Sequence, residues 1–279
     1  MIHKEGNFTG ANGTELYYQN WKPDGRVRCV LAIIHGFGEH SGRYMNIVNH
    51  VLPLECAVYG FDHRGHGQSD GKRGYITNWD EFRQDLHLFL DIIRAQEKDL
   101  PLIILGHSMG GLIVLNYLLC KPDENIAAVI ASSPLLAQPG ISPVLVLISR
   151  ILSRIWPGFS IETGLDAGTI SRDPKVVDAY LSDPLVHSTA SARFGTELTA
   201  TINWTQIHAA DFKYPLFIYH GQADQLVPVQ GSRKFYNNLR INDKKYIEYE
   251  QAYHETHNDI DKKIVLKNIS DWIEQHLAG

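Results

Sequence analysis

The pattern Gly-x-Ser-x-Gly at residues 106–110 lies directly between two apolar segments of different types. Residues 101–105 are apolar and rich in branched side chains, which is typical of a buried parallel strand, whereas residues 112–119 are apolar on nearly every side, as in a buried helix. Glycine two positions before and after a serine leaves room for a strained turn that packs against its neighbours. The sequence therefore predicts a nucleophile elbow, a strand–turn–helix unit with Ser108 at the tight turn.

Short apolar runs alternate with helix-compatible segments along most of the 279 residues. Strands are expected at 29–34, 57–61, 101–105, 126–131, 215–219 and 245–249, and helices at 44–52, 78–97, 112–119 and 264–277. An Asn-Gly turn at Asn12 adds an antiparallel hairpin before the first of these strands. The alternation predicts an α/β fold with a mostly parallel, doubly wound sheet.

The alternation stops after the strand at 126–131, where short helical segments separated by proline and glycine replace the strand-like runs. The length of the chain suits one α/β domain with an insertion better than two independent domains. We therefore expect a helical cap at 135–207, inserted into a core that is formed by 1–134 and 208–279.

Residues 143–156 of this insertion have the periodicity of an amphipathic helix. The polar face, which is expected to meet water, consists of Ser149, Arg150, Ser153 and Arg154. The broad apolar face includes Leu145, Ile148, Ile151, Leu152 and Ile155. We expect the apolar face to pack on the core domain, and the alternative is that part of it stays exposed and makes transient contact with a membrane or micelle.

Charge and cysteine content restrict the partners and the compartment of the protein. The net charge of −5, from 26 basic and 31 acidic residues without any basic run, argues against a nucleic-acid partner. The cysteines at 29, 56 and 120 have neither metal-site nor disulfide spacing, which favours a reducing compartment. Because no secretion signal is visible and no apolar run reaches about 20 residues, we expect a cytoplasmic protein without a membrane span.

A serine hydroxyl becomes a good nucleophile when a histidine removes its proton and a carboxylate orients that histidine. After an elbow serine, the acid and then the histidine follow later strands of the sheet. Asp224 comes directly after the strand at 215–219 and a glycine turn, and His254 follows the strand at 245–249. These two residues are the expected partners of Ser108. The alternatives are Asp178, Asp183 and Asp211 for the acid and His257 for the base.

An oxyanion hole needs two backbone N–H groups directed at the oxygen that becomes negative. The residue after the nucleophile, Met109, supplies one of them. The second is expected from Phe37, because the loop His35-Gly36-Phe37-Gly38 follows the strand at 29–34.

Three segments recur together in one known family. The segments are 35–44 (His-Gly-Phe-Gly-Glu-His-Ser-Gly-Arg-Tyr), 62–71 (Asp-His-Arg-Gly-His-Gly-Gln-Ser-Asp-Gly) and 106–111 (Gly-His-Ser-Met-Gly-Gly). Over nearly its whole length, the chain resembles the monoacylglycerol lipases and related lysophospholipases, which are serine α/β-hydrolases. The spacings of 116 residues from Ser108 to Asp224 and of 30 residues from Asp224 to His254 also look like those of the family.

The resemblance implies further site residues and a substrate. Four residues match positions that line the polar end of the acyl-glycerol pocket: Glu39, Arg43, Tyr180 and His257. The cap departs from that of the mammalian enzymes at 141–172, so their acyl-chain preference does not carry over. The histidines His40, His63, His66 and His107 are expected to make structural hydrogen bonds, and Asp62 and Arg64 to support a turn near the site.

We therefore expect a serine carboxylester hydrolase that cleaves monoacylglycerols, a class of small lipid ester, to fatty acid and glycerol through an acyl-enzyme, without a metal ion or organic cofactor. The alternatives on the same fold are a lysophospholipase, a small-ester esterase, an N-terminal-residue peptidase and a non-catalytic ligand-binding relative. A peptidase of that kind needs an anionic group for the substrate ammonium, and Glu39 is the candidate.

Overall fold

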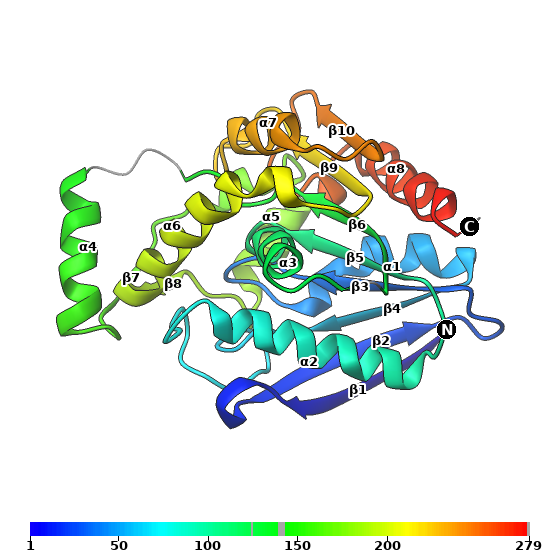
Figure 1. The fold of residues 1–279 in the computed structure, drawn as a ribbon, viewed down its shortest axis with the longest axis horizontal. Helices are drawn as coiled ribbons and strands as arrows, with labels where there is room; N and C mark the ends of the chain where they lie inside the picture. The colour runs from blue at the N-terminus through cyan, green and yellow to red at the C-terminus, as the bar shows by residue number, and fades with distance from the viewer. Residues whose placement is uncertain (124, 139–142, 278–279) are drawn as a thin grey trace.

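The computed structural model describes residues 1–123, 125–138 and 143–277. Within these residues, eight strands form one sheet in the order β1-β2-β4-β3-β5-β6-β9-β10. The strands are β1 (Ile2–Thr9), β2 (Glu15–Lys22), β3 (Cys29–Ile34), β4 (Cys56–Phe61), β5 (Leu102–His107), β6 (Ile126–Ser132), β9 (Leu216–Gly221) and β10 (Lys244–Tyr249). β2 pairs antiparallel with β1 and with β4, and the neighbours from β4 to β10 are parallel, so the expected mostly parallel sheet is confirmed (Figure 1).

Helices cover both faces of this sheet because the central strands are apolar on both sides. In β3, Leu31 and Ile33 face a layer that contains α1 (Met45–Val51) and α8 (Lys262–Gln275). The alternate residues of β3 face the second layer, whose helices are α2 (Asp80–Gln96), α3 (Met109–Cys120), α6 (Ala192–Ile207) and α7 (Val229–Asn238). The doubly wound arrangement follows from this two-sided burial.

A buried ion pair joins the loop after β4 to α2 and to the turn of the N-terminal hairpin. The Arg64 guanidinium donates to both carboxylate oxygens of Asp85 at 2.6 and 2.8 Å and to the carbonyl oxygen of Ala11 at 3.0 Å. Asp62 supports the same loop, because its carboxylate accepts hydrogen bonds from Ser41 N–H at 2.8 Å and Gln68 N–H at 2.8 Å. Asp62 and Arg64 therefore hold the turn, as the sequence predicts.

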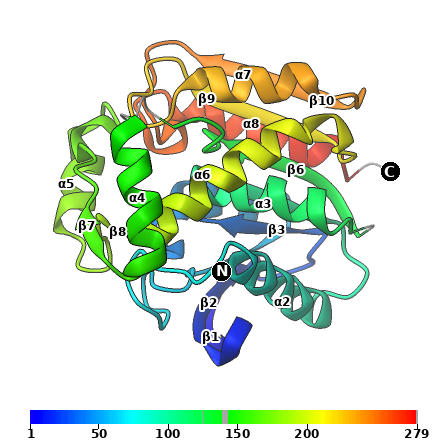
Figure 2. The ribbon, with the colours of Figure 1, turned by 60° about the vertical axis from the view of Figure 1, so that its left-hand side comes forward.

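The segment between β6 and β9 forms one end of the molecule. It contains α4 (Pro143–Ile155), β7 (Ser160–Glu162), α5 (Pro174–Ser182) and β8 (Thr189–Ser191), followed by α6 (Figures 1 and 2). β7 and β8 pair antiparallel, although the sequence predicts no strand here, because three residues are too few to establish an alternating pattern. α6 leaves this end and places Phe194, Leu198 and Ile202 in the same core layer as α3.

The predicted orientation of the helix at 143–156 is wrong in part. Ser153 is 2% exposed and Ser149 Oγ donates to the carbonyl oxygen of Ala192 at 3.4 Å, whereas Ile151 and Ile155 are 49% and 78% exposed. The reason is that α4 packs on α6, and its small serine side chains allow a close approach to that helix. Arg150 and Arg154 are exposed as expected, and the side chains of Leu145 and Ile148 lie outside the described residues.

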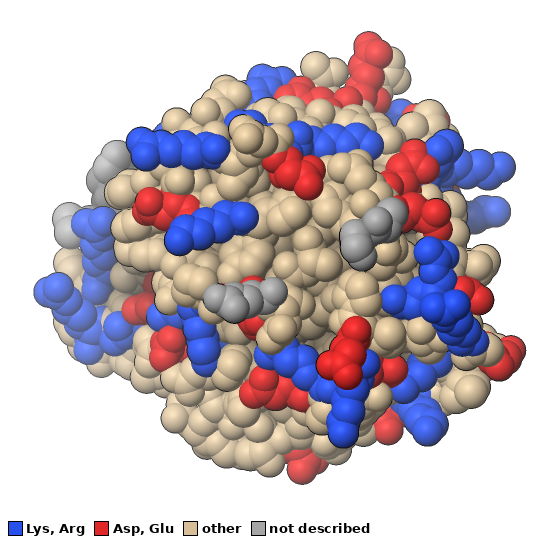
Figure 3. Space-filling model, turned by 45° about the vertical axis from the view of Figure 1, so that its right-hand side comes forward, with Lys and Arg blue, Asp and Glu red and all other residues tan. Residues whose placement is uncertain are grey.

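The surface and the helices show two further properties. Lys and Arg side chains alternate with Asp and Glu side chains over the face that Figure 3 presents. None of the helices in the described part of the chain has the length and the apolar character needed to cross a bilayer.

Asp85→Asn is expected to lower the free energy of unfolding by about 3 kcal/mol, because it removes the nearer of the two carboxylates that pair with the buried Arg64 guanidinium and leaves Glu81, at 3.6 Å, as the remaining counter-charge. Asp80→Asn is the matched control, since Asp80 pairs with Arg83 at the surface, and it should cost less than about 1 kcal/mol. Urea denaturation measures both values. Equal losses in the two variants would show that the Arg64–Asp85 pair does not stabilise the fold.

Candidate active site

Ser108 lies in the predicted strand–turn–helix unit, between the end of β5 and the start of α3. Its φ of 52° is in a region that residues with side chains rarely adopt, so the turn is strained. A Cβ atom on Gly106 would lie 2.6 Å from the carbonyl oxygen of Gly110, and one on Gly110 would lie 2.0 Å from the carbonyl oxygen of Ile34. Glycine is therefore required at both positions, and the serine backbone is fixed by its N–H donating to Ser132 O at 2.9 Å.

Asp224 and His254 form a buried hydrogen-bonded pair beyond the ends of β9 and β10. The distance from His254 Nδ1 to Asp224 Oδ2 is 2.6 Å. The other carboxylate oxygen, Oδ1, accepts the N–H groups of Leu226 at 2.8 Å and Val227 at 2.9 Å. These bonds fix the plane of the carboxylate. Because His254 binds Asp224 through Nδ1, its other ring nitrogen, Nε2, is the one that can accept a proton.

The electrostatics of this pair suit a general base with an ionised partner. Burial raises the pKa of Asp224, but the charge of His254 and hydrogen bonds from His220 and His254 outweigh burial and hold that pKa well below its ordinary range. Burial lowers the pKa of His254, and the charge and hydrogen bond of Asp224 outweigh it, so the pKa is raised overall. An ionised Asp224 stabilises the imidazolium that forms when His254 takes a proton.

The alternative residues lie in other surroundings. Asp178 is exposed on α5, Asp211 is exposed ahead of β9, and Asp183 is 2.9 Å from His40 Nε2. His257 stacks on Tyr44 with ring centroids 5.3 Å apart, and burial lowers its pKa to about 4. Among the candidates, the structure therefore brings Asp224 and His254 together.

His220 is a second histidine at the same carboxylate, and sequence reasoning assigned it no role. Its Nε2 is 3.0 Å from Asp224 Oδ2, and its Nδ1 is 2.8 Å from Ser232 Oγ. The available signal was its place at the end of β9, four residues before Asp224, where the end of a parallel strand directs side chains toward the site.

The loop after β3 packs against the serine turn. A Cβ atom on Gly36 would lie 3.2 Å from Ser108 Cβ, so the two backbones approach closely. The Gly36 N–H donates to Glu39 Oε1 at 2.7 Å, and His35 accepts the N–H of His63 at 2.9 Å. Phe37 follows Gly36 in this loop, while Met109 is the first residue of α3, where an N–H has no partner within the helix.

The resemblance places Arg43 and three other residues at the polar end of the pocket. In the structure the three others, Glu39, Tyr180 and His257, lie near Arg43. The guanidinium donates to Glu39 Oε2 at 2.9 Å and lies 4.6 Å from the centre of the Tyr180 ring. His257 joins the cluster by stacking on Tyr44, whose hydroxyl group donates to Glu39 Oε1 at 2.6 Å.

Glu255 belongs to this cluster and was missed in the sequence. Its carboxylate accepts two hydrogen bonds from Arg43, at 2.7 and 2.9 Å. Burial raises the pKa of Glu255, but the charge and hydrogen bonds of Arg43 outweigh it and lower that pKa. The signal that was available is its place directly after His254.

Within the described part of the chain, no group of three or more His, Cys, Asp or Glu side chains is arranged to hold a metal ion. An elbow serine and a buried Asp–His pair, carried on the ends of parallel strands, define the class of the protein as a serine hydrolase with the α/β-hydrolase fold.

Comparisons with known proteins agree with this class. A model of the family described as serine aminopeptidase, S33, matches residues 25–261. The chain is 38% identical to a monoacylglycerol lipase of Mycolicibacterium smegmatis over 98% of each chain, and 31% identical to a phospholipase of Bacillus subtilis over 92% of this chain and 99% of that protein. A soluble variant of monoglyceride lipase from Saccharomyces cerevisiae, solved with a substrate analogue, superimposes with a TM-score of 0.87 at 27% identity, covering 98% of this chain and 94% of that one. The chain belongs to the monoacylglycerol lipase-like family of serine α/β-hydrolases.

Asp224→Asn is expected to preserve the fold and to lower kcat for ester hydrolysis by about 10⁴, because an amide favours the wrong tautomer of His254. Steady-state kinetics on a soluble ester measures the loss. Asp211→Asn is the matched control for an acid that lies ahead of the same strand, and it should stay within about twofold of the wild type. A loss of less than tenfold in Asp224→Asn would mean that another carboxylate orients the base.

Proposed function

We propose that this protein cleaves monoacylglycerols to fatty acid and glycerol through an acyl-enzyme on Ser108. The observation that carries the proposal is the 2.6 Å hydrogen bond between buried Asp224 and His254. Both residues lie on loops at the same edge of the sheet as the elbow, beyond the carboxyl ends of the parallel strands. The relatives named as monoacylglycerol lipases, which match nearly the full length of the chain, support the choice of substrate.

In this reaction His254 acts first as a general base and then as a general acid. His254 removes the proton of Ser108 as the hydroxyl oxygen attacks the ester carbonyl, and Asp224 stabilises the imidazolium. The N–H groups of Phe37 and Met109 stabilise the negative oxygen of the tetrahedral intermediate. His254 then gives the proton to the leaving glycerol oxygen, and a water molecule, activated by the same histidine, hydrolyses the acyl-enzyme.

The polar cluster around Arg43 is suited to the alcohol part of the substrate. We assign Glu39, Arg43, Tyr180 and His257 to the glycerol end of the pocket, because Glu39 also holds the loop beside Ser108. Hydroxyl groups can exchange hydrogen bonds with carboxylate, guanidinium and phenol groups without adding charge to this buried cluster.

The same cluster argues against two alternative functions. The carboxylate of Glu39 is paired with the Arg43 guanidinium at 2.9 Å, so a substrate ammonium would have to bind beside that cation, whereas a neutral hydroxyl group meets no such repulsion. This disfavours an N-terminal-residue peptidase. A phosphate headgroup would have to compete with Glu39 and Glu255 for Arg43, which disfavours a lysophospholipase.

We also propose that residues 135–207 form the cap of the pocket and that its apolar surface meets lipid. The exposed large apolar side chains among the described residues of this segment are Ile151, Ile155, Trp156, Ile161, Leu165, Leu181, Trp204 and Ile207. Apolar groups that protrude beside basic side chains favour transient binding to a membrane or micelle. This arrangement suits a cytoplasmic enzyme that takes its substrate from a lipid surface.

A fluorophosphonate probe is expected to label Ser108 alone, and Ser108→Ala should abolish both labelling and hydrolysis, because this serine has the base and the oxyanion donors. The value of kcat/KM is then measured for a panel of monoacylglycerols, lysophospholipids, p-nitrophenyl esters and aminoacyl amides, and the four classes are ranked. The proposal requires monoacylglycerols to rank first. Preference for lysophospholipids or aminoacyl amides would assign the protein to the corresponding alternative, and labelling at another serine would disprove the site.

Ile155→Asp is expected to reduce binding to phospholipid vesicles and hydrolysis of vesicle-borne monoacylglycerol by about tenfold, with hydrolysis of a soluble short-chain ester unchanged. Ile264→Asp is the matched control, since Ile264 is also an exposed isoleucine, at 59% against 78% for Ile155, but lies on α8, outside residues 135–207. Vesicle co-sedimentation and kinetics measure both effects. Equal behaviour of the two variants would remove the special role of the cap surface.

A further inference from the structure

One stretch of the segment between β6 and β9, residues 170–172, is bonded directly to the loop that carries His254. The N–H of Glu255 donates to the carbonyl oxygen of Ile170 at 2.7 Å. Ser171 Oγ donates to the carbonyl oxygen of Asn258 at 3.3 Å. These bonds join residues that are about 85 positions apart in the sequence, one set in the inserted segment and the other on the loop of the general base.

Asp259 is the centre of this contact. Its carboxylate is 1% exposed and accepts the N–H of Arg172 at 3.0 Å and the Nε–H of the same residue at 2.9 Å. The oxygen that pairs with Arg172 Nε, Oδ2, also accepts the N–H of Tyr253 at 2.9 Å. Tyr253 directly precedes His254, so one carboxylate links Arg172 to the backbone next to the base.

The charge state of Asp259 fits this role. Burial raises the pKa of this carboxyl, but the N–H groups of Tyr253 and Ile260 and the guanidinium of Arg172 outweigh it and hold the pKa below its ordinary value. The ionised state of Asp259 is therefore stabilised by Arg172 from the inserted segment and by the N–H groups of the His254 loop. Loss of one donor leaves a buried charge less well solvated, which favours movement of the loop.

His254 is held from the core side by different atoms. Ser133 Oγ donates to the carbonyl oxygen of His254 at 2.9 Å, and Asp224 binds the imidazole ring. On the other side, Tyr253 and Glu255 are the residues bonded to 170–172 and Asp259. The core therefore holds atoms of His254 itself. The inserted segment holds its two neighbours, Glu255 directly through Ile170 and Tyr253 indirectly through Asp259.

We propose that Arg172 is a positioning residue for catalysis, which holds the His254 loop in register through Asp259. The inserted segment then supports the general base as well as covering the substrate. The proposal rests on the assignment of His254 as the base. A displacement of a catalytic group by about 1 Å can cost a factor of 10² in rate, so a modest loosening of the loop is measurable.

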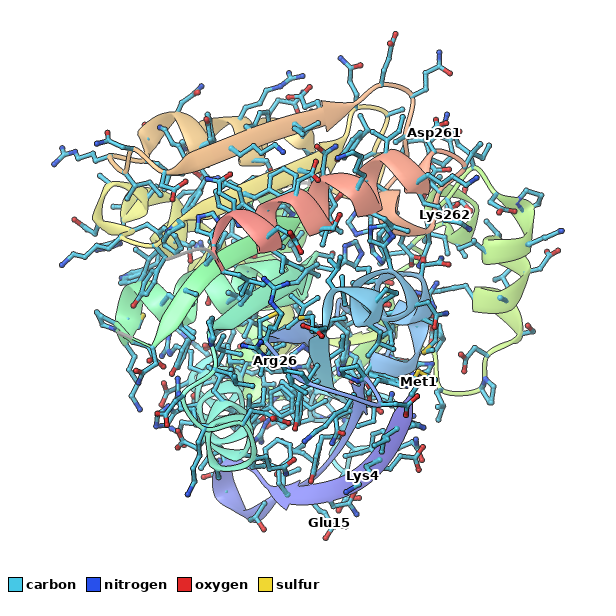
Figure 4. The ribbon with its side chains drawn as sticks, turned by 90° about the vertical axis from the view of Figure 1, so that its right-hand side faces the viewer. Met1, Lys4, Glu15, Arg26, Asp261 and Lys262 are labelled. Atoms are coloured by element: carbon cyan, nitrogen blue, oxygen red, sulfur yellow. The ribbon has the colours of Figure 1, made fainter. Side chains whose placement is uncertain are left out.

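The test compares two aspartates that bind the same arginine. Asp259 binds Arg172 and Tyr253. Asp261, which Figure 4 labels, is exposed and directly precedes α8. Its carboxylate accepts a hydrogen bond from Nη2 of Arg172 at 2.8 Å. The variants are Arg172→Ala, Arg172→Lys, Asp259→Asn and Asp261→Asn. Kinetics on a soluble short-chain ester separates kcat from KM without a contribution from lipid binding.

Arg172→Ala and Asp259→Asn are expected to lower kcat and the rate of fluorophosphonate labelling by about 10- to 100-fold, with KM within about threefold of the wild type. Arg172→Lys should recover part of the loss, and Asp261→Asn should stay within about twofold of the wild type. Thermal unfolding of each variant shows whether the fold is kept. If Asp259→Asn does not fold, the two Arg172 variants decide the question.

The pH profile gives a readout that a general loss of stability would not produce. The neutral form of the base is active, so kcat/KM falls as the pH drops through the pKa of His254, which the bond to Asp224 raises. A looser loop weakens that bond, so this acid limb should move to lower pH in Arg172→Ala. The other titratable and charged groups that face His254 are unchanged in this variant: His107, His257, Glu255, Glu39 and Arg43.

The inference is overturned if Arg172→Ala keeps the wild-type kcat and pH profile, or if Asp261→Asn loses as much activity as Asp259→Asn. Failure of the proposed function gives a different result, because the wild-type enzyme would then show no labelling of Ser108, or His254→Ala would retain activity. Labelling in the wild type with unchanged rates in Arg172→Ala rejects the positioning role alone.

Discussion

The close approach of the serine turn to β3 is the constraint on which the rest of the site depends. A side chain at Gly110 would collide with the backbone of Ile34, so the N-terminal end of α3 can lie against the sheet only with glycine at this position. The contact holds Ser108 in a strained backbone conformation and brings the loop that begins at His35 beside it. Strain of this kind persists because the packing of β3, β5 and α3 around it is extensive.

Much of the fold follows from burial that a sequence displays directly. The central strands are apolar on both sides, and their ends carry the glycines and polar residues of the site, so the sheet and the order Ser108, Asp224, His254 can be predicted from one chain. Sequence reasoning missed two residues for different reasons: His220 contacts Asp224 only four positions away, whereas Glu255 owes its role to Arg43, 212 positions earlier in the chain. The position of each residue, at the end of β9 or directly after His254, indicates that it lies near the site, but the pairing of Glu255 with Arg43 cannot be predicted from one chain because nothing local links the two residues.

The inserted segment shows a different limit of prediction. Helical periodicity located α4 but gave the wrong neighbour to part of its polar face, since hydrophobicity alone predicts that serine faces water. Ser149 and Ser153 instead permit close contact with α6, in the way that small residues do between packed helices. The two three-residue strands β7 and β8 escaped prediction because their pairing, and not their composition, defines them.

The contact between α4 and α6 divides the residues of α4 into a group that packs on α6 and a group that faces outward. Because small side chains attach α4 to α6, the larger apolar residues Ile151 and Ile155, which are 49% and 78% exposed, contribute little to that packing. Substitutions there change the solvent-facing surface while the scaffold that supports Ser108 and His254 stays the same. Natural variation can therefore change the outer surface of α4 at small risk to the chemistry, and the same positions offer an engineer a place to alter what the surface of the protein meets without altering the site.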